Sequence, residues 1–420
     1  MRAISLGIPR SKWRRIVMDA FVARQPIFDK FQKVIAYELL FRKSSNNFYE
    51  GSDADEATMN VISDGFLLIG MESLTGGKKA FINFTDTLLK SEIVSTLPKD
   101  IVVVEILEDV KVDKELVIAC QKLKKLGYTI VLDDFIFDYR FSPLIELADI
   151  IKIDFKLTLG SERKEVIEKV SNRNIKFLAE KVETIEDFNE AVGYGYSYFQ
   201  GYFFSKPVIL YAKDFPIGKE NHIMLLFELA KPDVDFVKIE SIIKRDVSLS
   251  FKLLRFINSA CFGIRTKVDS IKHALILLGK DDVSKWVYLI ALKDMGKGKP
   301  DELMRISVIR GKFGELISTK IKMTNRSADI FFMGILSLID AITNLTMENV
   351  LAQMPIAEDI KEALLGKDNA FRDVYELIIS YESGDWNKFS FQAKKLNLDE
   401  KLVPEIYLQS IEWVNEFLQL

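Results

Sequence analysis

Histidine and cysteine are scarce in this chain of 420 residues, which contains two of each. Two histidines are too few for a histidine-rich metal site, so any hydrolytic chemistry must rely on carboxylates, amides and lysines. The two cysteines, Cys120 and Cys261, provide neither a disulfide framework nor a cysteine zinc cluster. Such a composition is typical of a reducing compartment, and we expect a cytoplasmic protein.

The chain also lacks an excess of one charge and a long apolar run. Its 58 lysines and arginines nearly balance 61 aspartates and glutamates, for a net charge of −3, and no basic stripe stands out. We therefore expect no nucleic-acid partner. The longest apolar run, residues 331–345, contains Asp340 and is shorter than the roughly 20 residues of a membrane span, so no span is expected.

Residues 1–17 form a basic N-terminal extension without a single acidic residue. This extension lacks the continuous apolar region of a signal peptide. Met18 directly precedes the first strand-like segment. Its position favours a cloning remnant or an upstream start over a membrane-touching arm.

The composition, 48% hydrophobic and 28% charged, is that of a globular protein, and the length predicts two or three domains. In the first domain, residues 18–209, short apolar runs alternate with helical stretches at 54–68, 114–126 and 162–171. This alternation and the number of strands favour a closed, TIM-like (β/α)8 barrel. The hairpin spacing of the first two strands predicts one antiparallel strand. The expected strands are 21–28, 33–41, 80–84, 101–106, 128–132, 150–153, 175–178 and 196–199.

After a linker at residues 210–220, strand patterns vanish, and residues 221–420 predict an all-α domain. Residues 246–258 read as a capped helix with Leu249, Leu253 and Phe256 on one face. Further helical segments are expected at 274–278, 303–321, 330–345 and 405–418.

Caps and core residues of this helical domain are also predicted. Ser248 is expected to cap the helix of residues 246–258, and Asn258 to form the turn at its end. The expected aromatic core residues are Phe251, Phe256, Phe262 and Trp286.

Acidic and amide side chains stand at the ends of successive strands of the predicted barrel, where functional groups of such barrels gather. One acid at a strand end is usually a helix cap or a solvated loop residue. A cluster is different, because buried carboxylates repel one another unless cations are bound. The candidate set is hard and all-oxygen, suited to Mg²⁺, Mn²⁺ or Ca²⁺. Its members are Glu38, Asn83, Glu105, Asp133 and Asp134.

Eight segments in order resemble the EAL domain of cyclic di-GMP phosphodiesterases over roughly residues 21–207. In the signature segment, Leu39 replaces the family's alanine. The eight segments are Arg24-Gln-Pro-Ile, Tyr37-Glu-Leu-Leu-Phe-Arg42, Phe81-Ile-Asn-Phe-Thr, Glu105-Ile-Leu-Glu108, Asp133-Asp-Phe, Ile151-Lys-Ile-Asp154, Ala179-Glu-Lys-Val-Glu183 and Gln200-Gly-Tyr-Phe-Phe-Ser-Lys-Pro.

The resemblance implies hydrolysis of one phosphodiester of cyclic di-GMP to the linear dinucleotide, with two cations that clamp the phosphate and activate water. The cations would be Mg²⁺ or Mn²⁺, and Ca²⁺ would inhibit or substitute. Asp133 would bridge the cations or hold the second one. The ligands implied for the first cation are Glu38, Asn83, Glu105 and Asp134.

The resemblance also assigns roles beyond the metal ligands. Lys152 would position the water, and Glu180 would assist at the metal or as a base. The residues implied in binding the nucleotide or lining its pocket are Gln25, Arg42, Asp154 and Gln200.

Two departures from the family pattern concern the same site. Ile136 and Asp138 replace glycines of a loop that Glu108 anchors in the family, and they do not supply positive φ as cheaply. Lys181 replaces a glycine next to Glu180, so that its ammonium either lies near the acidic cluster or points to solvent.

These departures favour weak or absent hydrolysis, with the barrel as a cyclic di-GMP sensor or scaffold. An active phosphodiesterase is the alternative.

Residues 244–263 and 270–279 resemble the HDOD domain, a helical relative of HD-type phosphohydrolases that lacks their metal chemistry. The expected counterpart of their Gly-Leu-Leu-His-Asp pattern runs from Gly334 to Asp340 and has no histidine. His222 and His273 stand alone on helical segments, so we expect surface residues rather than ligands. The resemblance implies an interaction module for a protein partner, and a homodimer stays open.

Overall fold

The computed structural model describes residues 20–43, 71–91, 93–135, 138–170, 174–203, 220–229, 231, 233–258, 266–295, 298–354 and 356–418. The chain divides into two compact units. The first joins Met1–Phe204 with Ser380–Ser390 and Asp399–Glu405, and the second holds Ser205–Ile379, Phe391–Leu398 and Ile406–Leu420. The domain limits expected from the sequence fall within or at the edge of segments outside the described residues, and they stay a prediction.

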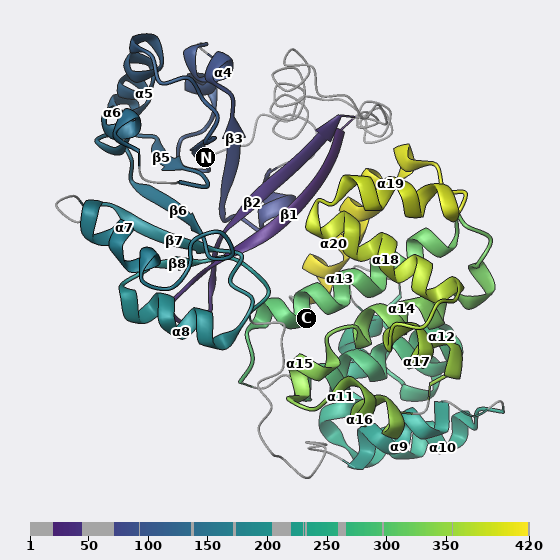
Figure 1. Cartoon of the computed structure of the whole chain (residues 1–420). Coiled ribbons are helices and arrows are strands. Elements are labelled where there is room, and N and C mark those ends of the chain that lie inside the picture. Colours follow the sequence, from purple (N-terminus) through teal and green to yellow (C-terminus); the bar gives the residue numbers. More distant parts are fainter. Residues whose placement is uncertain are drawn as a thin grey trace. The chain divides into compact units, whose positions relative to one another are not determined.

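Eight strands of the first unit form a closed barrel in the order β1 to β8 (Figure 1). β1 runs antiparallel to both of its neighbours, β2 and β8, and the other neighbouring pairs are parallel. The predicted barrel with one antiparallel strand is therefore confirmed. The strands are β1 Ala20–Asp29, β2 Val34–Lys43, β3 Lys79–Phe84, β4 Val102–Ile106, β5 Thr129–Leu132, β6 Ile150–Asp154, β7 Lys176–Glu180 and β8 Tyr198–Phe199.

The helices of the barrel include α5, whose bounds match the predicted helix. The Asp113 side chain accepts a hydrogen bond from Leu116 N at the start of α5, and Gly127 ends the helix at φ 92°. The predicted helix at 54–68 lies outside the described residues. The described helices are α3 Met71–Thr75, α4 Asp86–Lys90, α5 Lys114–Leu126, α6 Ser142–Ile145, α7 Glu162–Val170 and α8 Ile185–Tyr194.

An apolar layer fills the interior of the barrel. Each of the strands β1 to β7 contributes one buried side chain to this layer, because alternate residues of a barrel strand face inward. We call these residues the barrel floor, since the polar groups described below follow them along the parallel strands. The floor consists of Ile27, Ala36, Phe81, Val103, Val131, Ile150 and Leu178.

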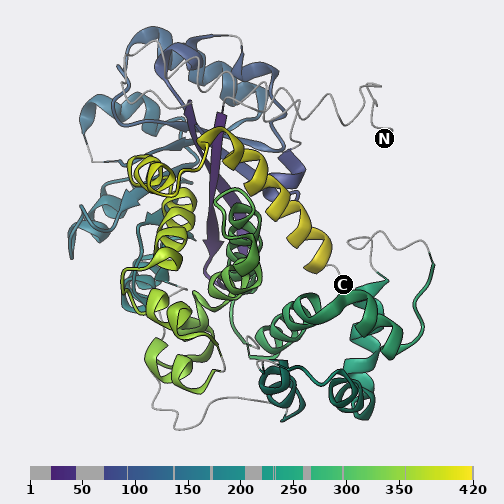
Figure 2. The same cartoon turned by 90° about the vertical axis from the view of Figure 1, so that its right-hand side faces the viewer.

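A short segment near the chain's end, Ser380–Ser390, belongs to the barrel unit and packs on β1. The ring of Phe21 lies 5.7 Å from that of Phe389 and 6.1 Å from that of Trp386, centroid to centroid. The Tyr381 hydroxyl donates a hydrogen bond to Val22 O at 3.2 Å. β1 and β2 are the purple pair of strands in Figure 2.

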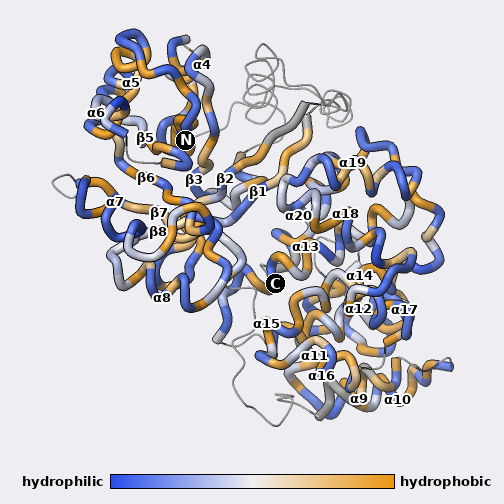
Figure 3. Tube along the Cα trace, in the orientation of Figure 1, coloured by the Kyte–Doolittle hydropathy of each residue, from blue (hydrophilic) through white to orange (hydrophobic). Residues whose placement is uncertain are grey.

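The second unit is helical throughout its described residues, as predicted. Along α18 the tube of Figure 3 alternates between apolar and polar segments, as expected of a helix with one buried face. Most residues of α13, in contrast, are buried. The helices of the second unit are α9 Glu220–Leu229, α10 Phe236–Arg245, α11 Val247–Ile257, α12 Ile271–Met295, α13 Asp301–Ser318, α14 Ser327–Leu336, α15 Ile339–Thr343, α16 Met347–Gln353, α17 Glu358–Leu364, α18 Ala370–Ser383, α19 Trp386–Lys395 and α20 Val403–Leu418. The last three also contribute residues to the barrel unit.

Two expectations for α11 are wrong. The helix is capped by Asp246, whose carboxylate accepts from Ser248 N and Leu249 N, because a side chain before the first turn reaches these N–H groups. Phe251 is 65% exposed, since it lies on the face opposite Leu249 and Leu253. Asn258 ends the helix as predicted.

The other predictions for the helical domain are confirmed only in part. Phe256 and Trp286 are buried as expected, and Phe262 lies outside the described residues. The segment expected as one helix at 330–345 forms α14 and α15, interrupted at Ser337 and Leu338. Among the described residues, no helix is long and apolar enough to cross a membrane.

The contact between Phe21 and the chain's end generates a prediction for stability. Phe389 is fully buried, so Phe389→Ala should lower the free energy of unfolding of the barrel unit by about 3–5 kcal/mol, the usual cost of such a cavity. Urea denaturation measures this loss.

The matched control is Phe391→Ala, because Phe391 is exposed. It should change the free energy of unfolding by less than about 0.5 kcal/mol. Equal losses in the two variants would show that the Phe389 ring does not stabilise the barrel.

Candidate functional site

The candidate site lies one inward-facing layer beyond the barrel floor. Because side chains alternate along a strand, the residue two positions after each floor residue faces the interior again. Strand pairing sets Asn83 beside Glu105 and Asp154 beside Glu180. The residues that follow floor residues at this spacing are Glu38, Asn83, Glu105, Asp133, Lys152 and Glu180.

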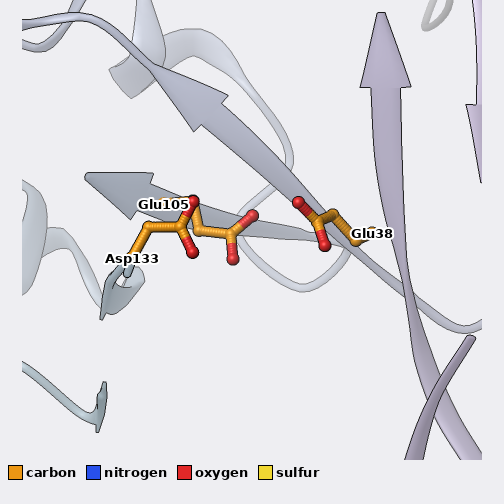
Figure 4. Close-up of side chains that lie close together, drawn as sticks. All are labelled: Glu38, Glu105 and Asp133. Atoms are coloured by element: carbon orange, nitrogen blue, oxygen red, sulfur yellow. The ribbon is translucent and has the colours of Figure 1, made fainter. Parts of the chain in front are cut away.

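The ammonium of Lys152 stands at the centre of this layer and is fully buried. Its Nζ lies 2.7 Å from Glu105 Oε1, 2.6 Å from Asp133 Oδ1 and 2.7 Å from Glu180 Oε1. Glu38 Oε2 is 3.5 Å away. Figure 4 shows the carboxylates of Glu105 and Asp133 close together and that of Glu38 directed toward them. One cation thus faces four carboxyl groups.

This excess of carboxyl groups governs protonation. Burial opposes the charged form of Lys152, but the surrounding carboxylates outweigh it and raise the lysine pKa well above its ordinary value. Burial raises the pKa of Glu105 and Glu180 well above the usual carboxyl range, although Lys152 acts in the opposite direction. Lys152 therefore stays charged, and Glu105 and Glu180 keep their protons to a higher pH than ordinary glutamates.

Two amide side chains, those of Gln200 and Asn83, orient the carboxylate of Glu38. Gln200 Nε2 donates to Glu38 Oε2 at 2.6 Å and to Gln25 Oε1 at 3.0 Å. Asn83 Nδ2 donates to Glu38 Oε1 at 3.4 Å, and Asn83 Oδ1 is buried without a partner among the described residues. Gln25 Nε2 in turn donates to Ser383 O at 3.3 Å. Both oxygens of Glu38 are thus held by amides.

The donor set fits a divalent cation. Two triads, one of Glu38, Glu105 and Asp133 and one of Asp133, Asp134 and Glu180, each offer ligand atoms within 4.8 Å of one another. The buried oxygens Asn83 Oδ1 and Asp134 Oδ1 have no hydrogen-bond partner within the described part of the chain. Buried oxygens without donors and an excess of carboxylates are what an oxygen-liganded cation satisfies.

Lys181 lies against the second triad rather than in solvent. Its Nζ contacts Asp154 Oδ2 and lies 3.9 Å from Asp134 Oδ2. Burial alone would raise the pKa of Asp154, but Lys181 and two backbone N–H groups, those of Lys156 and Leu157, lower it overall. Of the two positions expected for this lysine, the structure has the one near the acidic cluster.

A close backbone approach fixes the end of β8. Gly201 has φ 141°, and a Cβ there would stand 2.2 Å from Val182 O. Only glycine fits this position, so the chain after β7 lies directly against the residue that follows Gln200. The hydrogen bond from Val182 N to Gln200 O at 3.0 Å holds the two segments together.

The structure brings most of the predicted site residues into one connected group. The side chain of Arg42 lies outside the described residues, as do Ile136 and Phe137 of the departing loop. Glu108 is exposed. Sequence reasoning missed Ser383, whose backbone carbonyl carries no signal in the sequence and lies 358 residues after Gln25.

The described part of the helical unit has no comparable cluster. Among the described residues, the acidic, histidine and cysteine groups close enough to hold a metal ion all belong to the barrel. Ser337, within the segment expected as the Gly-Leu-Leu-His-Asp counterpart, accepts from Arg310 at 3.1 Å and donates to Gly334 O at 2.7 Å. His273 is exposed, and the side chain of His222 lies outside the described residues.

Comparisons with known proteins agree with this division. The EAL domain model matches residues 68–207, and the HDOD domain model matches residues 221–368. An EAL domain protein of Listeria monocytogenes is similar in structure, with 22% identity, 48% of this chain and 94% of that chain covered, and a TM-score of 0.37.

Two relatives align along nearly the whole chain. The uncharacterized protein YuxH of Bacillus subtilis is 37% identical, over 96% of this chain and 99% of its own length. The cyclic di-GMP phosphodiesterase CdgJ of Vibrio cholerae is 34% identical, over 95% of this chain and 93% of its own length. With an EAL domain followed by an HDOD domain, this chain belongs to the same family as CdgJ and YuxH.

Proposed function

We propose that this chain is a metal-dependent phosphodiesterase that hydrolyses cyclic di-GMP to the linear dinucleotide. The observation that carries the proposal is the layer of carboxyl and amide oxygens gathered from successive strands around the buried ammonium of Lys152. The relationship to the phosphodiesterase CdgJ supports the choice of substrate. The departures in the sequence favoured weak or absent hydrolysis, and this proposal takes the active alternative.

The residues that would hold the cation are Glu38, Asn83, Glu105 and Asp133, with Asp134 and Glu180 beside them. Mg²⁺ or Mn²⁺ bound there would polarise the phosphodiester and lower the pKa of water. Asn83 and Gln200 hold the two oxygens of Glu38 in place, so this ligand is oriented before the cation arrives. The preorganised carboxylates therefore need little rearrangement.

Lys152 and Glu180 would act on protons and charge. The Lys152 ammonium keeps its proton because its pKa is raised, so it orients water or a phosphate oxygen by donating hydrogen bonds and does not act as a base. Burial raises the pKa of Glu180 as well, which suits a carboxyl group that holds and then returns a proton. Gln25 and Gln200, with amides at the rim of the layer, would meet the nucleotide.

A second candidate function is nucleotide sensing without turnover. The contact of Lys181 with Asp154 and its approach to Asp134 favour it, because an ammonium there already balances part of the site's charge. In either case the HDOD domain would serve as the interaction module for a protein partner, since the described part of the helical unit holds no metal-ligand group.

Product analysis tests the proposal. Purified protein with cyclic di-GMP and Mg²⁺ or Mn²⁺ should yield the linear dinucleotide. Glu105→Gln should lower turnover by about 10²–10³-fold, comparable to the loss of one preorganised hydrogen-bond donor in an active site. Asp109→Asn is the matched control, because Asp109 is exposed just after the same strand. Calorimetric binding of the nucleotide without product would favour the sensor instead.

The raised pKa values predict how cation binding depends on pH. Glu105 and Glu180 hold protons when folded at a pH where an unfolded glutamate, with a pKa of about 4.3, has released them. The stability of the metal-free protein therefore falls as pH rises through the folded pKa values. A cation must displace these protons, so its affinity should rise over the same range.

Calorimetric titration with Mn²⁺ in buffers of different ionisation enthalpy measures the released protons. Glu105→Gln, which has no proton to release at this position, should release fewer. Binding that releases no protons at any pH would contradict the prediction.

A further inference from the structure

Two residues beside the site, Asp134 and Lys181, have left-handed backbone conformations without being glycine. Asp134 has φ 37° and Lys181 has φ 52°. The left-handed conformation costs more free energy for a lysine than for a glycine, and such strain persists only where the surrounding structure requires it. The two residues follow the ends of β5 and β7, and their side chains approach each other across the second triad.

The ammonium of Lys181 is fixed by its partners although its side chain is 49% exposed. Nζ contacts Asp154 Oδ2, and the Asp154 side chain is nearly fully buried. Asp154 Oδ1 accepts hydrogen bonds from Lys156 N at 2.6 Å and Leu157 N at 3.1 Å, so this carboxylate cannot turn away. The lysine therefore has a rigid acceptor and keeps its charge next to Asp134.

This position puts a permanent positive charge beside one of the two triads. The ammonium of Lys152 contacts members of both triads, since it lies 2.7 Å from Glu105, 2.6 Å from Asp133 and 2.7 Å from Glu180. Lys181 adds a second positive charge on the side of Asp134. Like charges a few ångströms apart repel strongly in a partly buried site. A cation at the Asp134 triad would meet this repulsion.

We propose that Lys181 takes over the charge of a second cation, so that this chain binds one divalent cation tightly, at the triad of Glu38, Glu105 and Asp133. The triad of Asp133, Asp134 and Glu180 binds a second cation at least about tenfold more weakly than it would without the lysine. Lys181 is thus a positioning residue that sets metal stoichiometry. This inference rests on the proposed function only in its choice of cation.

Counting bound Mn²⁺ tests the inference without turnover. Titration of the full chain, followed by the electron paramagnetic resonance signal of free Mn²⁺, should give one tight ion. Lys181→Gly removes the ammonium and suits the left-handed backbone, and it should tighten the second ion by about tenfold or more. Lys181→Asn, which also tolerates this conformation, should do the same and guards against an effect peculiar to glycine.

Two controls separate the charge at this position from charge in general. Lys181→Arg keeps the positive charge and should still give one tight ion. Lys156→Ala removes an exposed ammonium that contacts Glu183, and it should leave the count unchanged. Two equally tight ions in the unaltered chain, or no gain in either Lys181→Gly or Lys181→Asn, would overturn the inference.

The number of bound Mn²⁺ ions and the turnover assay test two separate claims, and each claim can be contradicted without the other. A single tight ion that becomes two in Lys181→Gly, without product from any variant, would support the role of Lys181 and reject the phosphodiesterase. Rapid product formation by a chain that binds two tight ions would do the reverse.

Discussion

The charge balance of the barrel interior depends on one buried ammonium, that of Lys152. Lys152 is enclosed by carboxyl groups from three other strands and by that of Asp133, which directly follows β5. None of these groups could stay buried and charged without a cation nearby. Because one lysine cannot balance them all, the pKa of Glu105 and of Glu180 is raised. The deficit of positive charge leaves the protein two means of compensation, protons or metal ions.

The alternation of strand residues explains how much of this site could be predicted from the sequence. Apolar runs that end in Asn83, Glu105 or Glu180 identify strands and ligands together, since the inward face is apolar at the floor and polar two residues later. Closure of the sheet then brings the strand ends together. Strand positions and ligand types are local information, which is why the expected barrel agrees with the structure.

Features that depend on distant contacts could not be predicted in this way. The amide of Gln25 meets Ser383 O, and no local pattern links them. Lys181 had two plausible positions, and only the fixed carboxylate of Asp154 selects one. Phe251 is a large apolar residue of the kind that usually lies in a core, yet it is exposed, because the buried face of its helix is the one with Leu249 and Leu253.

The packing of Phe21 against Phe389 has a consequence for the order of synthesis. The first described strand leaves the ribosome long before its aromatic partners Tyr381, Trp386 and Phe389, because Tyr381 is separated from Val22 of that strand by 359 residues. Contacts between such distant residues form slowly, because a long loop must close first. This strand must therefore stay partly uncovered until these distant aromatic residues have been made.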